Sequence, residues 1–447
     1  MNYQQFIENK KKYNAPIGLS EIPTLSPLLF PFQRDIVQWA LKRGRAAIFA
    51  QTGLGKSLME LSWGHAIYQA TGGAILLITP VAIAAQMIRE ANKFGIPARH
   101  VIDQSQVMPG INVTNYEKLH RFDLSKFVGV ILDESSILKS FTGRIRNMLI
   151  QQCSVVPYRL AASATPAPND YTELGNHAEF LGVMSMSSML ATFFTHDGGD
   201  TSKWRLKGHA NTEFWQWMCS WAVLLRKPSD LGYDNNGYDL PPIIEHEHIV
   251  QVDGPNAKTL SERIKARRST LFQRVIQAAS ITPSDKPFVW WCNLNDESDM
   301  LKQFIPGAVE VRGSDKESEK ERKLIDFSEC RIRVLITKPT ICGFGMNWQH
   351  CADTGFVGLN DSFEQLYQAI RRFWRFGQTR NVNVHYVSSS IEGAVIENLK
   401  RKERDAESMG NEMVSHMAGL TMNQLRTDTY NPTNPVITPN WLVSEVY

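Results

Sequence analysis

The chain has 447 residues, 43% hydrophobic and 21% charged, and its 48 Lys and Arg against 45 Asp and Glu leave a net charge of only +3. At roughly 150 residues per domain this length predicts two or three domains. The 21 Phe, 12 Tyr and 11 Trp exclude a mainly disordered chain. The small net charge does not by itself indicate a nucleic-acid-binding protein, although a local groove can still be basic.

Targeting and metal-binding signals are weak throughout the sequence. No apolar run approaches the roughly 20 residues of a membrane-spanning helix, and the polar start MNYQQFIENKKKYN lacks the apolar core of a secretion signal. The six Cys include no C-x-x-C pair, which is typical of a reducing compartment. His246, His248, His350 and Cys351 lack the spacing of a zinc site. We therefore expect a cytoplasmic protein with no membrane partner and no zinc.

Short apolar, β-branched segments alternate with amphipathic ones in the first 180 residues. The expected strands are 46–50, 74–79, 127–132 and 158–162, and the expected helices between them are 55–68 and 81–94. This alternation predicts a parallel sheet with helices on both faces.

The pattern breaks between about Gly182 and Pro242. This segment is rich in Met, Trp and Gly and contains the turn clusters HDGGD, KPSD and GYDNNGYD. It predicts an insertion and a linker with a helix around 211–225.

The strand–helix alternation resumes in the second half. The expected strands are 288–292, 308–311, 333–337 and 382–387, the expected helices are 362–375 and 391–407, and an irregular tail follows Arg426. The predicted fold class is α/β, with two parallel-sheet domains joined by a short, mainly helical insertion. The predicted ranges are 1–180 and 246–400 for the two domains, 181–245 for the insertion and linker, and 401–447 for the tail.

A phosphate-binding loop follows the first expected strand. The segment AQTGLGKS, Ala50 to Ser57, matches G-x-x-x-x-G-K-[ST] everywhere except at its first position. Its glycines let backbone N–H groups surround phosphates, Lys56 reaches the β/γ oxygens, and the Ser57 hydroxyl binds Mg²⁺. A chance glycine-rich turn is the alternative, but the strand before it and the helix after it favour a nucleotide site. The predicted nucleotide-binding residues here are Gln51, Thr52, Gly53, Leu54, Gly55, Lys56 and Ser57.

Two adjacent carboxylates end another expected strand. In VILDE, Asp133 and Glu134 come directly after apolar residues, and side chains at carboxyl ends of parallel strands face the ligand-binding crevice. We expect Asp133 to hold Mg²⁺, and Glu134 to position and deprotonate the attacking water. An apolar strand that ends in Asp-Glu is common by itself, so the signal depends on its combination with the phosphate loop.

Further short motifs follow in order along the chain. They are LFPFQ (29–33), LLITP (76–80), VTNY (113–116), SATP (163–166), TICGFGMN (340–347) and QAIRRFWRFGQ (368–378). The last one fits Q-x-x-x-R-x-x-R-x-G-Q, and at helical spacing the guanidinium groups of Arg372 and Arg375 share one face. A planar, permanently charged fork suits γ-phosphate charge. The alternative is a solvated basic face or a patch that contacts phosphates.

Together these motifs resemble helicase superfamily two, specifically its Snf-type branch of ATP-dependent DNA translocases, from about residue 28 to residue 390. The resemblance implies two RecA-like domains, ATP with Mg²⁺ in the cleft between them, duplex DNA as partner, and ATP hydrolysis coupled to movement along it. The compact build resembles bacteriophage and prophage members. That narrower resemblance implies a bacterial or phage-infected host cytoplasm, with replication or recombination proteins as possible partners.

The resemblance also assigns roles to single residues. Gln33 reads the adenine edge and Gly345 approaches the nucleotide, while Ser163 and Thr165 couple the nucleotide to DNA. The expected catalytic residues of the second domain are Arg375, Arg372 and Gln368. The expected contacts to the DNA backbone are Thr79, Pro80, Thr114, Asn115 and Gly343.

One motif departs from the family's pattern. Asp133-Glu134-Ser135-Ser136 replaces Asp-Glu-Ala-His or Asp-Glu-Gly-His, which removes one side-chain link between the ATP site and the second domain. Two alternatives stay open: an RNA-remodelling ATPase of the same superfamily, and a DNA-binding protein that uses ATP as a switch without moving. The presence of both Glu134 and Arg375 in the sequence argues against the switch, because a protein that only binds ATP as a switch does not require both residues.

Overall fold

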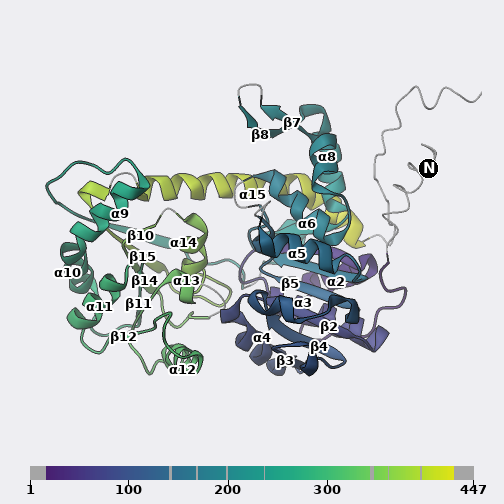
Figure 1. The fold of residues 1–447 in the computed structure, drawn as a ribbon, viewed down its shortest axis with the longest axis horizontal. Helices are drawn as coiled ribbons and strands as arrows, with labels where there is room; N and C mark the ends of the chain where they lie inside the picture. The colour runs from purple at the N-terminus through teal and green to yellow at the C-terminus, as the bar shows by residue number, and fades with distance from the viewer. Residues whose placement is uncertain are drawn as a thin grey trace, which may run out of the picture. The chain divides into compact units, whose positions relative to one another are not determined.

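The computed structural model describes residues 17–139, 143–167, 170–197, 200–235, 237–342, 347–360, 362–392 and 395–426. The chain divides into two compact units (Figure 1). The first unit comprises Met1–Asp234 together with Met409–Tyr447, and the second unit comprises Asn235–Ser408. Each contains one large parallel sheet, so the predicted α/β class with two RecA-like domains is confirmed.

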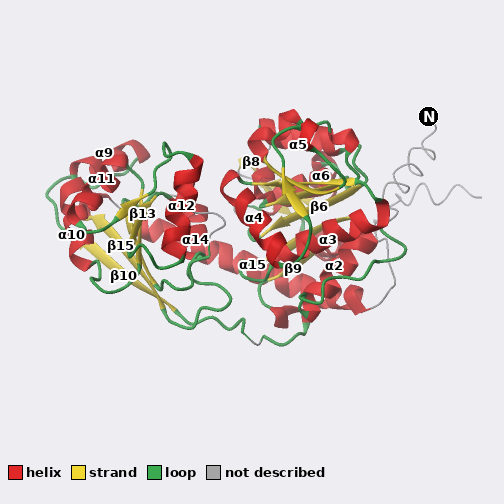
Figure 2. Ribbon diagram, turned by 90° about the horizontal axis from the view of Figure 1, so that it is seen from below, coloured by secondary structure: helices red, strands yellow, loops and turns green. Residues whose placement is uncertain are grey.

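The sheet of the first unit has seven strands in the order β3-β4-β2-β5-β6-β1-β9, all parallel. The strands are β1 Arg45–Ala50, β2 Ala74–Thr79, β3 Ala98–His100, β4 Gly110–Asn115, β5 Gly129–Asp133, β6 Tyr158–Ser163 and β9 Ala222–Leu225. Five of six residues in β1 and in β2 are buried, as expected for strands with helices on both faces. Figure 2 shows helices on either side of this sheet.

The helices of the first unit include α3, which carries the second half of the phosphate loop. They are α2 Pro31–Arg43, α3 Lys56–Thr71, α4 Val81–Lys93, α5 Arg144–Cys153, α6 Leu174–Leu181, α7 Met186–Phe193 and α8 Asn211–Cys219. α3 is apolar almost all round, with Leu58, Trp63 and Ile67 among its buried residues. A helix of this kind packs in the interior rather than on the surface.

The helix predicted around 211–225 is present but shorter than expected. α8 ends at Cys219, and Ala222–Leu225 form β9, which pairs with β1 at the sheet edge. A hairpin of β7 Phe194–Asp197 and β8 Asp200–Leu206 adds an antiparallel sheet. The sequence AVLL suits a buried strand, which explains why the helix does not continue. The segment is therefore partly a component of the first unit's core, because β9 completes its sheet.

The sheet of the second unit has six parallel strands in the order β10-β15-β14-β11-β13-β12. The strands are β10 Ile243–Val250, β11 Phe288–Cys292, β12 Val309–Glu310, β13 Val334–Thr337, β14 Asp353–Val357 and β15 Val382–Ser389. The helices are α9 Leu260–Ser269, α10 Leu271–Ile281, α11 Asn295–Phe304, α12 Glu317–Ser328, α13 Pro339–Cys342 and α14 Phe363–Ile370. β10 and β14 were not expected, because β10 alternates with charged residues at an edge and β14 contains Asp and Gly.

The last helix, α15 Val395–Arg426, begins in the second unit and ends in the first. It extends well beyond the expected 391–407, because Met413 and Met417 are buried in the first unit's core. His416 stacks on Trp215 with ring centroids 5.2 Å apart. The compact units therefore differ from the predicted ranges at both β9 and α15. Among the described residues, no helix combines the length and apolar character needed to span a membrane.

Candidate active site

The phosphate loop connects β1 to α3 and requires glycine at two places. Gly53 and Gly55 have φ of +93° and +78°, in the left-handed region. A Cβ at Gly55 would lie 2.3 Å from Nε2 of Gln33. Ala50 replaces the first glycine of the pattern without cost, because it is still the last residue of β1.

Lys56 closes this loop on itself. Its Nζ donates to the backbone oxygen of Ala50 over 3.0 Å, and Lys56 and Ser57 are the first two residues of α3. The N–H groups of a helix N-terminus attract anions. The hydroxyl of Thr52 is buried and has no hydrogen-bond partner within the part of the chain that the structure describes. The loop thus presents donors of the kind that phosphate oxygens accept.

Gln33 lies against the loop from α2. Its side chain is buried, Nε2 donates to the oxygen of Leu54 over 2.8 Å, and Oε1 accepts from the N–H of Phe30 over 2.9 Å. Both polar ends of the amide are therefore held by the chain. The contact with the loop fits a nucleotide-binding residue, and the adenine-reading role stays a prediction.

Three neighbouring strand ends meet at Asp133. Its Oδ2 accepts from the hydroxyl of Thr79 over 2.8 Å, and its backbone oxygen accepts from the phenol of Tyr116 over 2.7 Å. Burial, followed by the charge of Glu134, raises the pKa of Asp133 to about 6. Lys56 opposes this shift. Carboxylate and hydroxyl oxygens are hard donors that suit Mg²⁺.

Glu134 has a left-handed backbone, with φ of +55°, which is uncommon for a residue other than glycine. Its Oε1 accepts from the hydroxyl of Ser163 and from that of Ser136, each over 3.2 Å. Ser163 Oγ also accepts from the N–H of Thr165 over 3.1 Å. The expected water-activating residue and the expected coupling motif are therefore joined by a hydrogen bond. Strained backbone of this kind gathers at functional sites.

In the second unit the arginine motif is not one helix. α14 ends at Ile370, so Arg372 and Arg375 lie in the turns that follow. The expectation that they share a helical face is wrong. Gln368 and Arg372 are buried, and Arg372 Nε donates to the oxygen of Gln368 over 3.2 Å. Arg371 instead packs on aromatic rings, 4.8 Å from the Tyr367 centroid and 4.1 Å from that of Trp374.

Comparison with known proteins gives one curated relative. No family model matches the chain. The mouse DNA annealing helicase and endonuclease ZRANB3 is 22% identical over 415 residues, which cover 80% of this chain and 38% of the relative. The chain is therefore similar, over most of its own length, to a protein that is named a DNA annealing helicase. It spans only about 38% of that relative's length.

Two solved structures are similar. A putative HsdR subunit of a type I restriction enzyme from Vibrio vulnificus YJ016 gives a TM-score of 0.52 at 14% identity, over 89% of this chain and 70% of that one. The SWI2/SNF2 ATPase core of Sulfolobus solfataricus in complex with double-stranded DNA gives a TM-score of 0.44 at 17% identity. This match covers 92% of this chain and 98% of that one. The first of these supports the α/β fold described above.

Two further residues of the first unit's site were not expected. Glu60 on α3 is fully buried, and neither carboxylate oxygen has a hydrogen-bond partner among the described residues. Burial, followed by the charge of Asp133, raises the pKa of Glu60 well above its usual range. His177 on α6 is also fully buried, with Nε2 3.1 Å from Ser135 Oγ. An acid within the apolar run LMELSW could have indicated Glu60, whereas no pattern in the sequence indicates His177.

The residues that we expected to contact DNA are mostly buried. The side chains of Thr79, Thr114 and Asn115 are all buried, and Asn115 Oδ1 accepts from the N–H of Lys118 over 3.1 Å. Pro80 is partly exposed and precedes α4. Gly343 and Gly345 lie outside the described residues. The DNA-contact roles therefore stay predictions.

The end of the arginine motif has a structural function. Gln378 Nε2 donates to the backbone oxygens of Gln349 and Phe373, each over 3.1 Å. Its Oε1 accepts from the N–H groups of Thr379 and Arg380, each over 3.0 Å. One buried amide thereby fixes several segments of the second unit.

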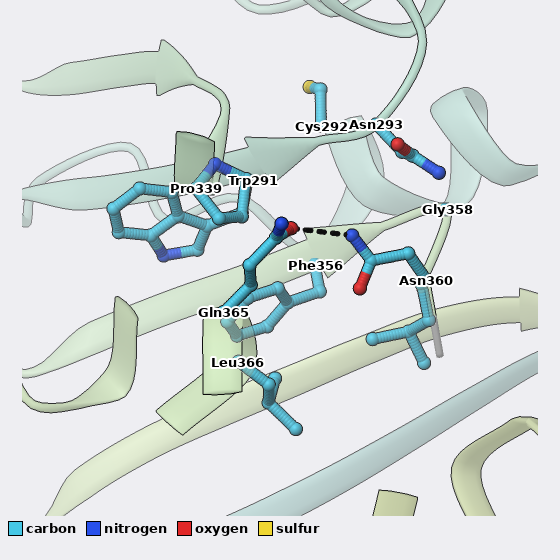
Figure 3. A pocket seen from close by; sticks show the side chains of 10 residues that line it. Trp291, Cys292, Asn293, Pro339, Phe356, Gly358, Asn360, Gln365 and Leu366 are labelled. Carbon is cyan, nitrogen blue, oxygen red and sulfur yellow. Dashed lines mark hydrogen bonds between the residues drawn. The ribbon is translucent and has the colours of Figure 1, made fainter. Parts of the chain in front are cut away.

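A pocket opens at the carboxyl ends of β11 and β14 in the second unit (Figure 3). Asn360 Nδ2 donates to Gln365 Oε1 over 2.7 Å beside the rings of Trp291 and Phe356. This is the edge at which open parallel sheets receive ligands. The second unit therefore also presents polar side chains at its strand ends.

Proposed function

We propose that this chain is an ATP-dependent motor that acts on DNA and couples ATP hydrolysis to movement along the duplex. The observation that carries the proposal is the hydrogen bond between Glu134 and Ser163. It links the carboxylate beside the phosphate loop to the motif that we expect to sense DNA. A passive nucleotide site needs no such link.

The first unit supplies the groups for binding and for proton transfer. Lys56 and the N–H groups of the loop hold the phosphates, and Gln33 fixes the loop. Ser57 and Asp133 would hold Mg²⁺, and the adjacent carboxylates of Asp133 and Glu134 would give the cation negatively charged surroundings. Bound Mg²⁺ neutralises charge on the phosphate oxygens.

Glu134 acts as the general base. Its carboxylate accepts a proton from the attacking water, whose oxygen forms the new bond to the γ-phosphorus while the bond to the β–γ bridging oxygen breaks. The products are ADP and phosphate. The two serine hydroxyls on Oε1 hold the carboxylate in one orientation, so its other oxygen can receive the proton.

The second unit is proposed to complete the reaction. By the family resemblance, ATP reacts in the cleft between the two RecA-like domains, and Arg375, with Arg372 and Gln368, stabilises charge on the γ-phosphate. Such an arginine is worth about 10³ to 10⁵ in rate in related systems. Hydrolysis would then depend on domain closure, and the ATP cycle would become motion along DNA.

The choice of DNA rests on the relative, which is named a DNA annealing helicase. Backbone contacts to duplex DNA would give salt-sensitive binding with little sequence preference. Replication or recombination proteins are the partners we expect, in the cytoplasm of a bacterial or phage-infected cell. This location and the phage origin rest on the sequence alone.

The experiment is a steady-state ATPase assay with no nucleic acid, duplex DNA, single-stranded DNA or RNA. Strong stimulation by duplex DNA supports the proposal, and displacement of a triplex-forming strand would then test translocation. Stimulation by RNA alone supports the RNA-remodelling ATPase instead. ATP binding without hydrolysis under every condition supports the switch.

A further inference from the structure

His177 contacts residues next to two motifs of the candidate ATP site, the phosphate loop and the acidic motif Asp133-Glu134. It lies on α6 and is fully buried. One ring nitrogen, Nε2, is 3.1 Å from the hydroxyl oxygen of Ser135. The ring also meets Phe49 edge to face, with centroids 5.1 Å apart. Phe49 is the next-to-last residue of β1, directly before the phosphate loop, and Ser135 directly follows Glu134.

The backbone around Glu134 is held from both sides. On the preceding side, the phenol of Tyr116 donates to the oxygen of Asp133 over 2.7 Å. On the following side, Ser135 is fully buried and its hydroxyl meets His177. A left-handed conformation is unfavourable at a residue other than glycine, because Cβ comes too close to the following carbonyl oxygen. Such a conformation persists only where the surrounding contacts over-determine it.

We propose that His177 is a positioning residue that holds Glu134 in its left-handed, catalytic orientation through Ser135. The inference deepens the proposed function and rests on it. The acidic motif here ends in Ser135 and Ser136, and the imidazole reaches it from α6.

The proposed role depends on a hydrogen bond and not on charge. Burial lowers the pKa of His177 to about 4, so the ring is neutral at every pH where the ATPase would be assayed. A neutral imidazole offers one donor and one acceptor nitrogen, and Ser135 can serve either one. Removal of the ring nitrogen leaves a buried hydroxyl without its partner.

The test compares kcat and KM for ATP in His177→Phe, Ser135→Ala, the double variant and His177→Gln, with saturating duplex DNA. His177→Phe and Ser135→Ala should each lower kcat about tenfold, as loss of an outer-shell partner does. KM for ATP should stay within about twofold, because the phosphate loop is untouched. The kcat of the double variant should be no lower than that of either single variant, because the two substitutions remove the same contact. His177→Gln, whose amide can reach Ser135, should recover most of the wild-type kcat.

His65→Phe is the matched control, because His65 is a partly buried histidine of the same unit that lies on α3 and contacts Tyr68. It should keep the wild-type kcat. A purely structural role for His177 would lower the melting temperature while leaving kcat per folded molecule intact, and this result overturns the proposal. Unchanged kcat in both His177→Phe and Ser135→Ala also overturns it. If the wild type itself hydrolyses no ATP, the proposed function fails instead, and the two failures are thereby distinguished.

Discussion

The two units arrange the side chains of their motifs differently. In the first, the motif residues bond to one another across strand ends, as Thr79 does to Asp133 and Ser163 to Glu134. In the second, Arg372 and Gln378 donate hydrogen bonds to backbone oxygens of their own unit. The motif residues of the first unit therefore form one hydrogen-bonded cluster. In the arginine motif of the second unit, some residues are buried and pack within the unit, whereas Arg375 is partly exposed.

The difference between buried and partly exposed residues predicts which substitutions in the arginine motif change stability and which change catalysis. Gln368, Arg372 and Gln378 are buried, whereas Arg375 is partly exposed. A buried, bonded residue acts first on the stability of its unit, and a partly exposed arginine can reach a ligand. We therefore expect substitutions in the first unit to remove chemistry and those in the second to separate into chemical and structural classes.

Lys56→Ala should have the largest effect. The variant loses both a phosphate-binding cation and stabilisation of the developing charge, so kcat/KM for ATP should fall by at least about 10⁴. Steady-state ATPase and fluorescent-nucleotide binding measure the two losses. Turnover above roughly a tenth of wild type would show that this loop is not the phosphate site.

Arg375→Ala separates binding from chemistry in the second unit. We expect ATP affinity close to wild type and kcat lower by about 10³, as for loss of an arginine finger. Arg331→Ala is a matched control, since Arg331 pairs with Asp326 on the surface of the same unit. Normal hydrolysis by Arg375→Ala would place the finger at another residue.

Strand positions and the phosphate loop could be predicted from the sequence, because both depend on local patterns. The strands 74–79 and 288–292 were predicted at their observed bounds. The end of α14 was not, since QAIRRFWRF continues a helical pattern, whereas in the fold the backbone oxygen of Arg372 accepts a hydrogen bond from the distant N–H of Trp348 over 2.9 Å. His177 and the left-handed Glu134 were not predictable either, because each depends on contacts between residues distant in sequence.

Gln378→Ala should destabilise the second unit without changing ATP binding. The variant loses an amide with several backbone partners, each worth about 0.5–1.5 kcal/mol, so the free energy of unfolding should fall by about 2–3 kcal/mol. Urea unfolding measures this change, and Gln303→Ala, an exposed position on α11, is the control. Unchanged stability with a large loss of kcat would make Gln378 a catalytic rather than a structural residue.

Glu60→Gln should change the stability of the protein to an extent that depends on pH. The pKa of Glu60 is raised in the folded protein, so the folded state retains a proton that the unfolded state releases above about pH 4.5. Wild-type stability is then lost as pH rises toward the folded pKa, by about 1.4 kcal/mol per pH unit. Glu60→Gln lacks this loss, so its stability relative to wild type should increase as the pH rises above about 4.5. Glu117→Gln, at an exposed position, should show no such trend.

The central claim is that the strand ends of the first unit hydrolyse ATP with Glu134 as base. The most direct test is the rate of ATP cleavage in a single turnover by Glu134→Gln, measured by chemical quench with duplex DNA present. We predict wild-type ATP affinity and a cleavage rate lower by about 10²–10⁴. Cleavage at the wild-type rate by this variant would contradict the account, because the carboxylate held by Ser136 and Ser163 would then take no part in the reaction.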